Sequence, residues 1–187
     1  MCSRRLPIRE RAETVALLWP PDGTLPASTT VKAYVPHFQL NRVWFDRVQA
    51  ASGWQITDEQ WNQLLTELLP DSMVFGTKGE EPVAVACALS REDGWRELAW
   101  VAVASHHRGN RVGKMVCSTL IQHLLTSGDQ LIFCSTQDER LAAIRIYLEI
   151  GFHPVHREEK IDRWREICDN LGWPFTPRSW GWPRDAD

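Results

Sequence analysis

The chain has 187 residues, 43% of them hydrophobic, which is enough for one sizeable core, so we expect a single domain. Its formal net charge of -3 and its pI of about 6.1 argue against a general nucleic-acid-binding protein. The five cysteines form no CxxC pair, and no apolar run suits a signal peptide or a membrane span. We therefore expect a cytoplasmic protein with reduced thiols, without metal ligands and without membrane contact.

The first elements are predicted from turn residues and from helical spacing. Residues 1 to 28 contain the proline-rich stretch LLWPPDGTLPAS, and we expect an arm with little regular structure. The β-branched stretch TTVKAYV, residues 29 to 35, predicts a first strand. Apolar spacing predicts a helix over residues 39 to 51 and a second over residues 57 to 69. The second helix opens with Thr57 and Gln60 at capping-box spacing.

A meander of strands is predicted next. Residues 73 to 89 contain two apolar runs around Lys-Gly-Glu-Glu-Pro, which is typical of a β-hairpin, and ELAWVAVA predicts a third strand over residues 97 to 104. The chain then alternates between helix and strand. We expect a helix over residues 110 to 127, a strand over 131 to 136, a helix over 138 to 152 that ends at Gly151, and an amphipathic helix within 156 to 172.

The segment SHHRGNRVGK, residues 105 to 114, connects a predicted strand to a predicted helix. Unpaired N–H groups at a helix N-terminus, with glycines and cations beside them, favour phosphate binding. An ordinary tight turn with solvated cations is the alternative. The segment has neither GxGxxG nor GxxxxGK[ST], so dinucleotide and P-loop sites lack their motifs.

Two motifs then carry a resemblance to a known family. The segment VAVASHHRGNRVGKMV resembles the pyrophosphate loop of the GCN5-related N-acetyltransferases, in which a valine precedes Arg-Gly-x-Gly-x-Gly or Ala. Val103, Arg108, Gly109 and Gly113 match this pattern, and Arg111 replaces its middle glycine. The later segment AAIRIYLEIGF is similar to the family's Ala-x-x-x-Tyr-x-x-x-Gly-Phe, through Ala143, Tyr147, Gly151 and Phe152.

The resemblance covers about residues 29 to 155 and implies an α/β (α+β) fold. We expect a mixed, mostly antiparallel sheet flanked by helices, with the pantetheine site between splayed strands 4 and 5. Residues 29 to 155 would form the acetyltransferase domain, residues 1 to 28 an N-terminal arm, and residues 156 to 187 a C-terminal helix and tail packed on the same domain. The family fold usually closes with a hairpin, and the helical pattern after residue 156 implies either a displaced last strand or a short sheet.

The same resemblance implies acetyl-CoA as cosubstrate and a set of residues that bind it. Its pantetheine would pair with the backbone of Trp100 to Val103, like an added strand. Its pyrophosphate would bind the amides of the following loop, and Arg140 stands where the family often has an asparagine. The implied cofactor-binding residues are Val101, Ala102, Val103, Arg108, Gly109, Asn110, Arg111, Val112, Gly113, Lys114 and Arg140.

Two residues are candidates for proton transfer. Glu97 stands where one branch of the family has its glutamate base, and a solvated charge is its alternative interpretation. Tyr147 occupies the family's acid position, and a packing tyrosine is its alternative. A nucleophile at Cys134 with a base at His106 or His107 is a weaker hypothesis, because a buried cysteine usually acts as a small hydrophobe.

We therefore expect an acetyl-CoA-dependent N-acetyltransferase that acts on a primary amine of a small molecule or on an exposed amino group, by direct attack in a ternary complex. The chain is also a candidate to form a homodimer. A non-catalytic acyl-CoA-binding module is the alternative, and an interaction protein that uses its tryptophan-rich ends is a third hypothesis. Tryptophans of the first two helices, among them Trp44, Trp54 and Trp61, belong either to the core or to an aromatic acceptor pocket.

Overall fold

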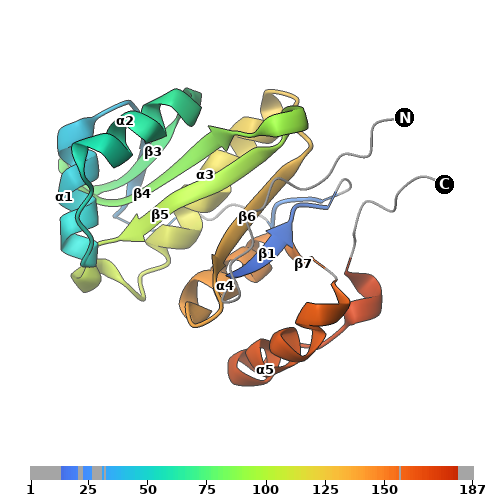
Figure 1. Ribbon diagram of the computed structural model, residues 1–187. Coiled ribbons are helices and arrows are strands. Elements are labelled where there is room, and N and C mark those ends of the chain that lie inside the picture. The colour runs from blue at the N-terminus through green and yellow to red at the C-terminus, as the bar shows by residue number, and fades with distance from the viewer. Residues whose placement is uncertain (1–13, 21–22, 27–30, 32, 156, 181–187) are drawn as a thin grey trace.

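A seven-stranded sheet forms the centre of the computed structural model, which describes residues 14–20, 23–26, 31, 33–155 and 157–180 (Figure 1). The strand order is β2-β3-β4-β5-β6-β1-β7, and every neighbouring pair is antiparallel except β5 and β6. The strands are β1 (Thr14–Leu18), β2 (Val35–Phe38), β3 (Leu68–Lys78), β4 (Glu81–Ser90), β5 (Arg96–Val103), β6 (Ile132–Gln137) and β7 (His153–Pro154). This mixed, mostly antiparallel sheet confirms the expected fold class.

Helices cover both faces of the sheet because the central strands are apolar on both sides. Along β3, Met73 and Phe75 pack with the residues of α1 and α2, whereas Val74 between them packs with α3 on the opposite face. Figure 1 shows α5 at the β7 end of the sheet, away from α1 and α2. The helices are α1 (Arg42–Ser52), α2 (Asp58–Glu67), α3 (Val112–Thr126), α4 (Leu141–Ile150) and α5 (Ile161–Leu171).

The predicted start of α2 and the predicted end of α4 are confirmed, because neighbouring residues determine both. Thr57 and Gln60 form a complete capping box at the start of α2, with bonds of 2.9 and 3.2 Å. Gly151 ends α4 in the left-handed region with φ 114°, which a glycine adopts without a Cβ penalty. The hairpin of β3 and β4 and the antiparallel pairing of β5 with β4 confirm the predicted meander. Among the described residues, no helix combines the length and the hydropathy that a membrane crossing requires.

The expectation of little regular structure in the first 28 residues was wrong for residues 14 to 18. They form β1, which pairs with β6 on one side and with β7 on the other. Val15, Leu17 and Leu18 are buried, so the apolar run forms a strand that the following proline terminates. Residues 1–13, 21–22 and 27–28 of the expected arm lie outside the described residues.

Both ends of the predicted domain also differ from expectation. The first strand expected over residues 29 to 35 lies later, at Val35–Phe38, and residues 29, 30 and 32 lie outside the described part of the chain. The strand after α4 is only two residues long and pairs with β1, and α5 follows it as predicted. The strand that pairs with the far edge of β6 is therefore the N-terminal strand β1. Neither expected alternative, a displaced last strand or a short sheet, included this arrangement.

Because β1 supplies core residues, its truncation should destabilise the fold. Leu17 is fully buried opposite Cys134, and Leu17→Ala should lower the free energy of unfolding by about 2–5 kcal/mol. Val35, which is 53% exposed on β2, provides the control, and Val35→Ala should change stability by no more than about 0.5 kcal/mol. Urea unfolding of both variants measures the difference. Equal stabilities would show that β1 is not an integral strand.

Candidate functional site

The site begins where β5 and β6 stop pairing. The two parallel strands are in register only from Arg96 to Leu98, opposite Ile132–Cys134. Beyond Leu98 the pairing of the described strands continues only on the β4 side of β5, with a register shift between Val85 and Cys87. Trp100 lies at this irregularity with φ 53°, so a β-bulge turns the second half of β5 away from β6.

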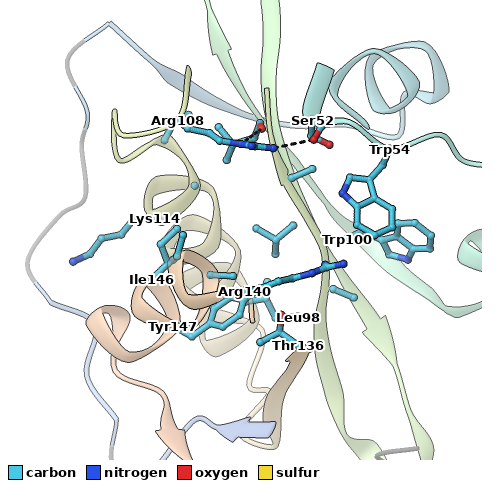
Figure 2. A pocket seen from close by; sticks show the side chains of 18 of the residues that line it. Ser52, Trp54, Leu98, Trp100, Arg108, Lys114, Thr136, Arg140, Ile146 and Tyr147 are labelled. Atoms are coloured by element: carbon cyan, nitrogen blue, oxygen red, sulfur yellow. Dashed lines mark hydrogen bonds between the residues drawn. The ribbon is translucent and has the colours of Figure 1, made fainter. Parts of the chain in front are cut away.

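A cavity of about 890 Å³ occupies the space between the diverging strands. One wall is β5 from Leu98 to Val103, and a second is the loop and helix start from His107 to Lys114. The start of α4 and the connection between α1 and α2 close the remaining sides (Figure 2). All eleven residues implied to bind the cofactor are within or beside these walls, and all but Asn110 line the cavity. A cleft of this size does not fit the third hypothesis, a flat interaction surface.

The loop before α3 has the backbone that an anion site needs. Gly109 and Arg111 both have positive φ, 78° and 58°, and Arg111 is the N-cap residue of the fifteen-residue helix α3. The arginine therefore adopts the conformation expected of the family's glycine, at a cost of about 1 kcal/mol. A Cβ at Gly113 would lie 3.1 Å from Val103 and 3.3 Å from Ile146, so the helix start approaches β5 closely.

Two cations of the loop already have partners within the protein. Arg108 donates a 2.8 Å hydrogen bond to the carbonyl of Ser52, which joins the loop to the end of α1 across the cavity (Figure 2). Lys114 forms a 3.1 Å ion pair with Glu149 of α4. The amide of Arg108 also has a partner, the carbonyl of Ser105 at 3.3 Å, so the phosphate-binding capacity of this loop depends first on the backbone amides of residues 109 to 113.

Glu97 is placed beside the cavity without lining it. One carboxylate oxygen pairs with Arg91 at 2.6 Å, and the other accepts a 3.1 Å hydrogen bond from the hydroxyl of Ser135. Arg91 also pairs with Glu67. Ser135 lines the cavity, so any proton path from the cavity to Glu97 runs through Ser135 or a water molecule. The assignment of Glu97 as base stays a prediction.

Tyr147 lines the cavity from α4, together with Leu98 of β5 and Thr136 of β6 (Figure 2). Its side chain is buried and packs edge-on against Phe152. Burial is the main cause that raises the pKa of the Tyr147 phenol well above 10, with smaller contributions from Cys134 and Cys117. The phenol therefore keeps its proton at neutral pH and can act as a donor toward the cavity.

The hypothesis of a cysteine nucleophile has no support in the geometry. Cys134 is fully buried, burial raises the pKa of its thiol well above 9, and it does not line the cavity. His107 forms a 3.0 Å hydrogen bond through Nδ1 with the hydroxyl of Tyr34, and burial lowers its pKa. Glu81, His106 and His107 hold potential metal-ligand atoms within 4.8 Å of one another, although Glu81 and His106 are exposed. The absence of a metal site stays a prediction.

Sequence reasoning missed the pairing of Arg140 with Trp54. Arg140 is the N-cap residue of α4, and its guanidinium lies 4.8 Å from the ring centre of Trp54. Trp54 is 55% exposed and lines the cavity, whereas Trp44 and Trp61 pack in the core with Phe45. Trp44 and Trp61 therefore follow the core alternative. The expectation that Trp54 belongs to one of the first two helices was wrong, because it lies between α1 and α2, where no periodic pattern marks it.

Comparisons with known proteins agree with this geometry. The model of the acetyltransferase (GNAT) family matches residues 38–152. The chain is similar to the uncharacterized N-acetyltransferase YobR of Bacillus subtilis (strain 168), with 26% identity over 114 residues, which is 60% of this chain and 46% of YobR. The chain therefore spans about half the length of this curated relative.

Solved structures show the same fold at low sequence identity. A GCN5-related N-acetyltransferase from Sphaerobacter thermophilus is similar with a TM-score of 0.63 and 15% identity, over 76% of this chain and 48% of that one. A GNAT-family acetyltransferase from Colwellia psychrerythraea has a TM-score of 0.59 and 18% identity, over 77% and 53% of the two chains.

The raised pKa of Tyr147 predicts a loss of stability at high pH. The unfolded chain releases a phenolic proton at about pH 10, whereas the native chain holds it to higher pH, so the free energy of unfolding falls as the pH rises above about 10. Tyr147→Phe should make this fall less steep. Urea unfolding of both proteins across this range measures it, and the buried thiol of Cys117, with a pKa of about 12, contributes equally to both. Equal slopes would contradict the burial of the phenol.

Proposed function

Because the chain belongs to the acetyltransferase (GNAT) family, we propose that it transfers an acetyl group from acetyl-CoA to a primary amine of a small molecule or to an exposed amino group. The observation that carries the proposal is the divergence of β5 from β6, which opens a cavity between a free strand edge, a helix N-terminus and a buried phenol. Each of these three features suits a different part of the donor.

The residues present fit acetyl-CoA. The β6-facing edge of β5 after Leu98 can pair with the amides of a pantetheine arm, in the manner of β-augmentation. The amides of residues 109 to 113 lie at the positive end of the α3 dipole and suit a pyrophosphate. Gly113 supports this assignment because its lack of a side chain lets the helix start lie close to Val103.

The reaction needs one base and one acid. A lysine-like alkylammonium has a pKa of about 10.4, so it must lose a proton before its nitrogen can attack the thioester carbonyl. We assign this proton to Glu97, through the hydroxyl of Ser135 or a water molecule. The new N–C bond forms as the C–S bond breaks, and the leaving thiolate, with a solution pKa of about 8.5, takes the proton of Tyr147. The second proton, which the nitrogen loses as it becomes an amide, returns to the tyrosinate through water.

A non-catalytic acyl-CoA-binding module remains the alternative, and one observation favours it. Both oxygens of Glu97 already have partners, Arg91 and Ser135, so the carboxylate is held away from the cavity. In such a module Tyr147 would have only a packing role against Phe152. The role of Tyr147 therefore separates an enzyme from a binding module.

Tyr147→Phe should lower the rate of acetyl transfer by about a hundredfold while acetyl-CoA affinity stays nearly unchanged, because the substitution removes only the proton donor. The rate is measured by mass spectrometry of acetylated products from a pooled amine library, and the affinity by calorimetry. A packing tyrosine would give the opposite pattern. Full activity with stability lowered by roughly 1 kcal/mol would refute the assignment of Tyr147 as acid.

A further inference from the structure

The side of the cavity formed by α1, α2 and the middle of β5 is made of neutral side chains. We call it the acceptor wall, and it consists of Gln49, Trp54, Gln55, Ile56, Gln60 and Trp100. Two indoles and three amides offer stacking surface and hydrogen bonds but no negative charge. An acceptor with several ammonium groups, such as a polyamine, would find no counter-charge on this wall.

Trp100 and Trp54 reach the cavity from different elements. The bulge at Trp100 directs its ring toward Phe45 of α1, with ring centres 5.8 Å apart, while part of the residue lines the cavity. Trp54 follows the end of α1 and is more than half exposed. Figure 2 shows the two indoles on the same side of the cavity. A large exposed indole facing a cleft is suited to contact a flat apolar group.

Arg140 faces this wall from the opposite side. It stands at the start of α4, and Figure 2 shows its side chain extended across the cavity toward Trp54 and Trp100. Its guanidinium contacts the face of Trp54 at 4.8 Å, and the described residues give it no carboxylate partner. Glu139, its neighbour in sequence, lines the cavity but is exposed and forms no ion pair with it.

The other cations of the cavity have other contacts or positions. Arg108 is bonded to the Ser52 carbonyl, Lys114 is paired with Glu149, and Arg111 lies at the start of α3 with the loop amides. Among the cations that line the cavity in the described residues, Arg140 therefore lies opposite the acceptor wall and has no anionic partner. A planar guanidinium that rests on an indole presents its outer N–H groups as a fork, which fits a carboxylate with two parallel hydrogen bonds.

We propose that Arg140, Trp54 and Trp100 form a subsite for an amine acceptor that also carries a carboxylate and an aromatic ring, as an aromatic amino acid does. The carboxylate binds the fork of Arg140, the ring lies against the indole of Trp54, and the amine points toward β5, where the thioester would lie. This inference rests on the proposed acetyl transfer and specifies its substrate class. The proposal assigns Arg140 to binding of the acceptor, whereas the resemblance of the sequence to the family implied that Arg140 binds the cofactor.

Matched acceptor pairs test the carboxylate directly. Tryptophan and tryptamine differ only in the carboxylate, as do phenylalanine and phenethylamine. The wild-type protein should have a kcat/KM about tenfold to a hundredfold higher for the amino acid of each pair, because a hydrogen-bonded charge pair is lost with the carboxylate. Equal values for both members, or a preference for the decarboxylated amine, would overturn the proposal.

Substitution of Arg140 tests whether this residue causes the preference for the amino acid. Arg140→Gln should remove the preference by raising KM for tryptophan much more than KM for tryptamine, and Arg140→Lys should restore only part of the preference because lysine lacks the fork. Arg47, exposed on α1 and outside the cavity lining, provides the control, and Arg47→Gln should keep the wild-type preference. If Arg140→Gln instead weakens acetyl-CoA binding and keeps the preference, Arg140 serves the cofactor and the proposal fails.

Direct binding separates this proposal from the proposed function. Calorimetry of tryptophan with the CoA-loaded protein should show binding that Arg140→Gln weakens by the same tenfold to hundredfold. Such binding without any acetylated product would support the subsite and refute acetyl transfer. Acetylation of other amines, with no binding of tryptophan or phenylalanine, would support acetyl transfer and refute the subsite.

Discussion

The early end of the pairing between β5 and β6 is the constraint on which the rest of the site depends. A parallel ladder that stops after Leu98 leaves one edge of β5 open inside the protein, where unpaired backbone groups are costly unless a ligand or water binds them. The strands are joined firmly at their other end, where Arg96 donates its backbone amide to the carbonyl of Leu131 and pairs with Asp129 at 2.8 Å. The bulge at Trp100 then sets the direction in which they part.

The structure around this opening keeps it from closing. β1 pairs with the far edge of β6 and connects it to β7, so β6 is held in the sheet without further contact to β5. Trp19, which follows β1, packs edge-on against Phe152, and Phe152 in turn packs against Tyr147. The N-terminal strand thus helps to fix the position of the proposed acid, although the two are distant in sequence.

The sequence predicted those parts that depend on local chemistry. The capping box at Thr57, the terminal glycine of α4 and the apolar runs of the hairpin specify their elements through neighbouring residues alone. The loop from Arg108 to Gly113 was found because a strand, glycines and a helix start occur in one continuous segment. The positive φ of Arg111 follows from the family's glycine at this position and not from residue propensity, because side chains other than glycine rarely adopt it.

The parts that sequence reasoning missed depend on contacts between distant segments. β1 is a short apolar run beside two prolines, and only its pairing with β6 makes it a strand. The bulge at Trp100 interrupts a run that looks like a regular strand, and its positive φ is unfavourable for an indole side chain without the surrounding sheet. Likewise, Arg140 and Trp54 meet only because the connection of α1 and α2 folds over the start of α4.

Hydrogen exchange of the backbone amides, with and without acetyl-CoA, tests the central claim most directly, namely that the donor binds in the opening between β5 and β6. We expect slower exchange at those amides of residues 99 to 103 that face away from β4, and at residues 109 to 113, since these amides would gain partners. Amides of β2, at the far edge of the sheet, should be unaffected. Unchanged exchange in both segments at saturating acetyl-CoA, or protection elsewhere alone, would contradict it.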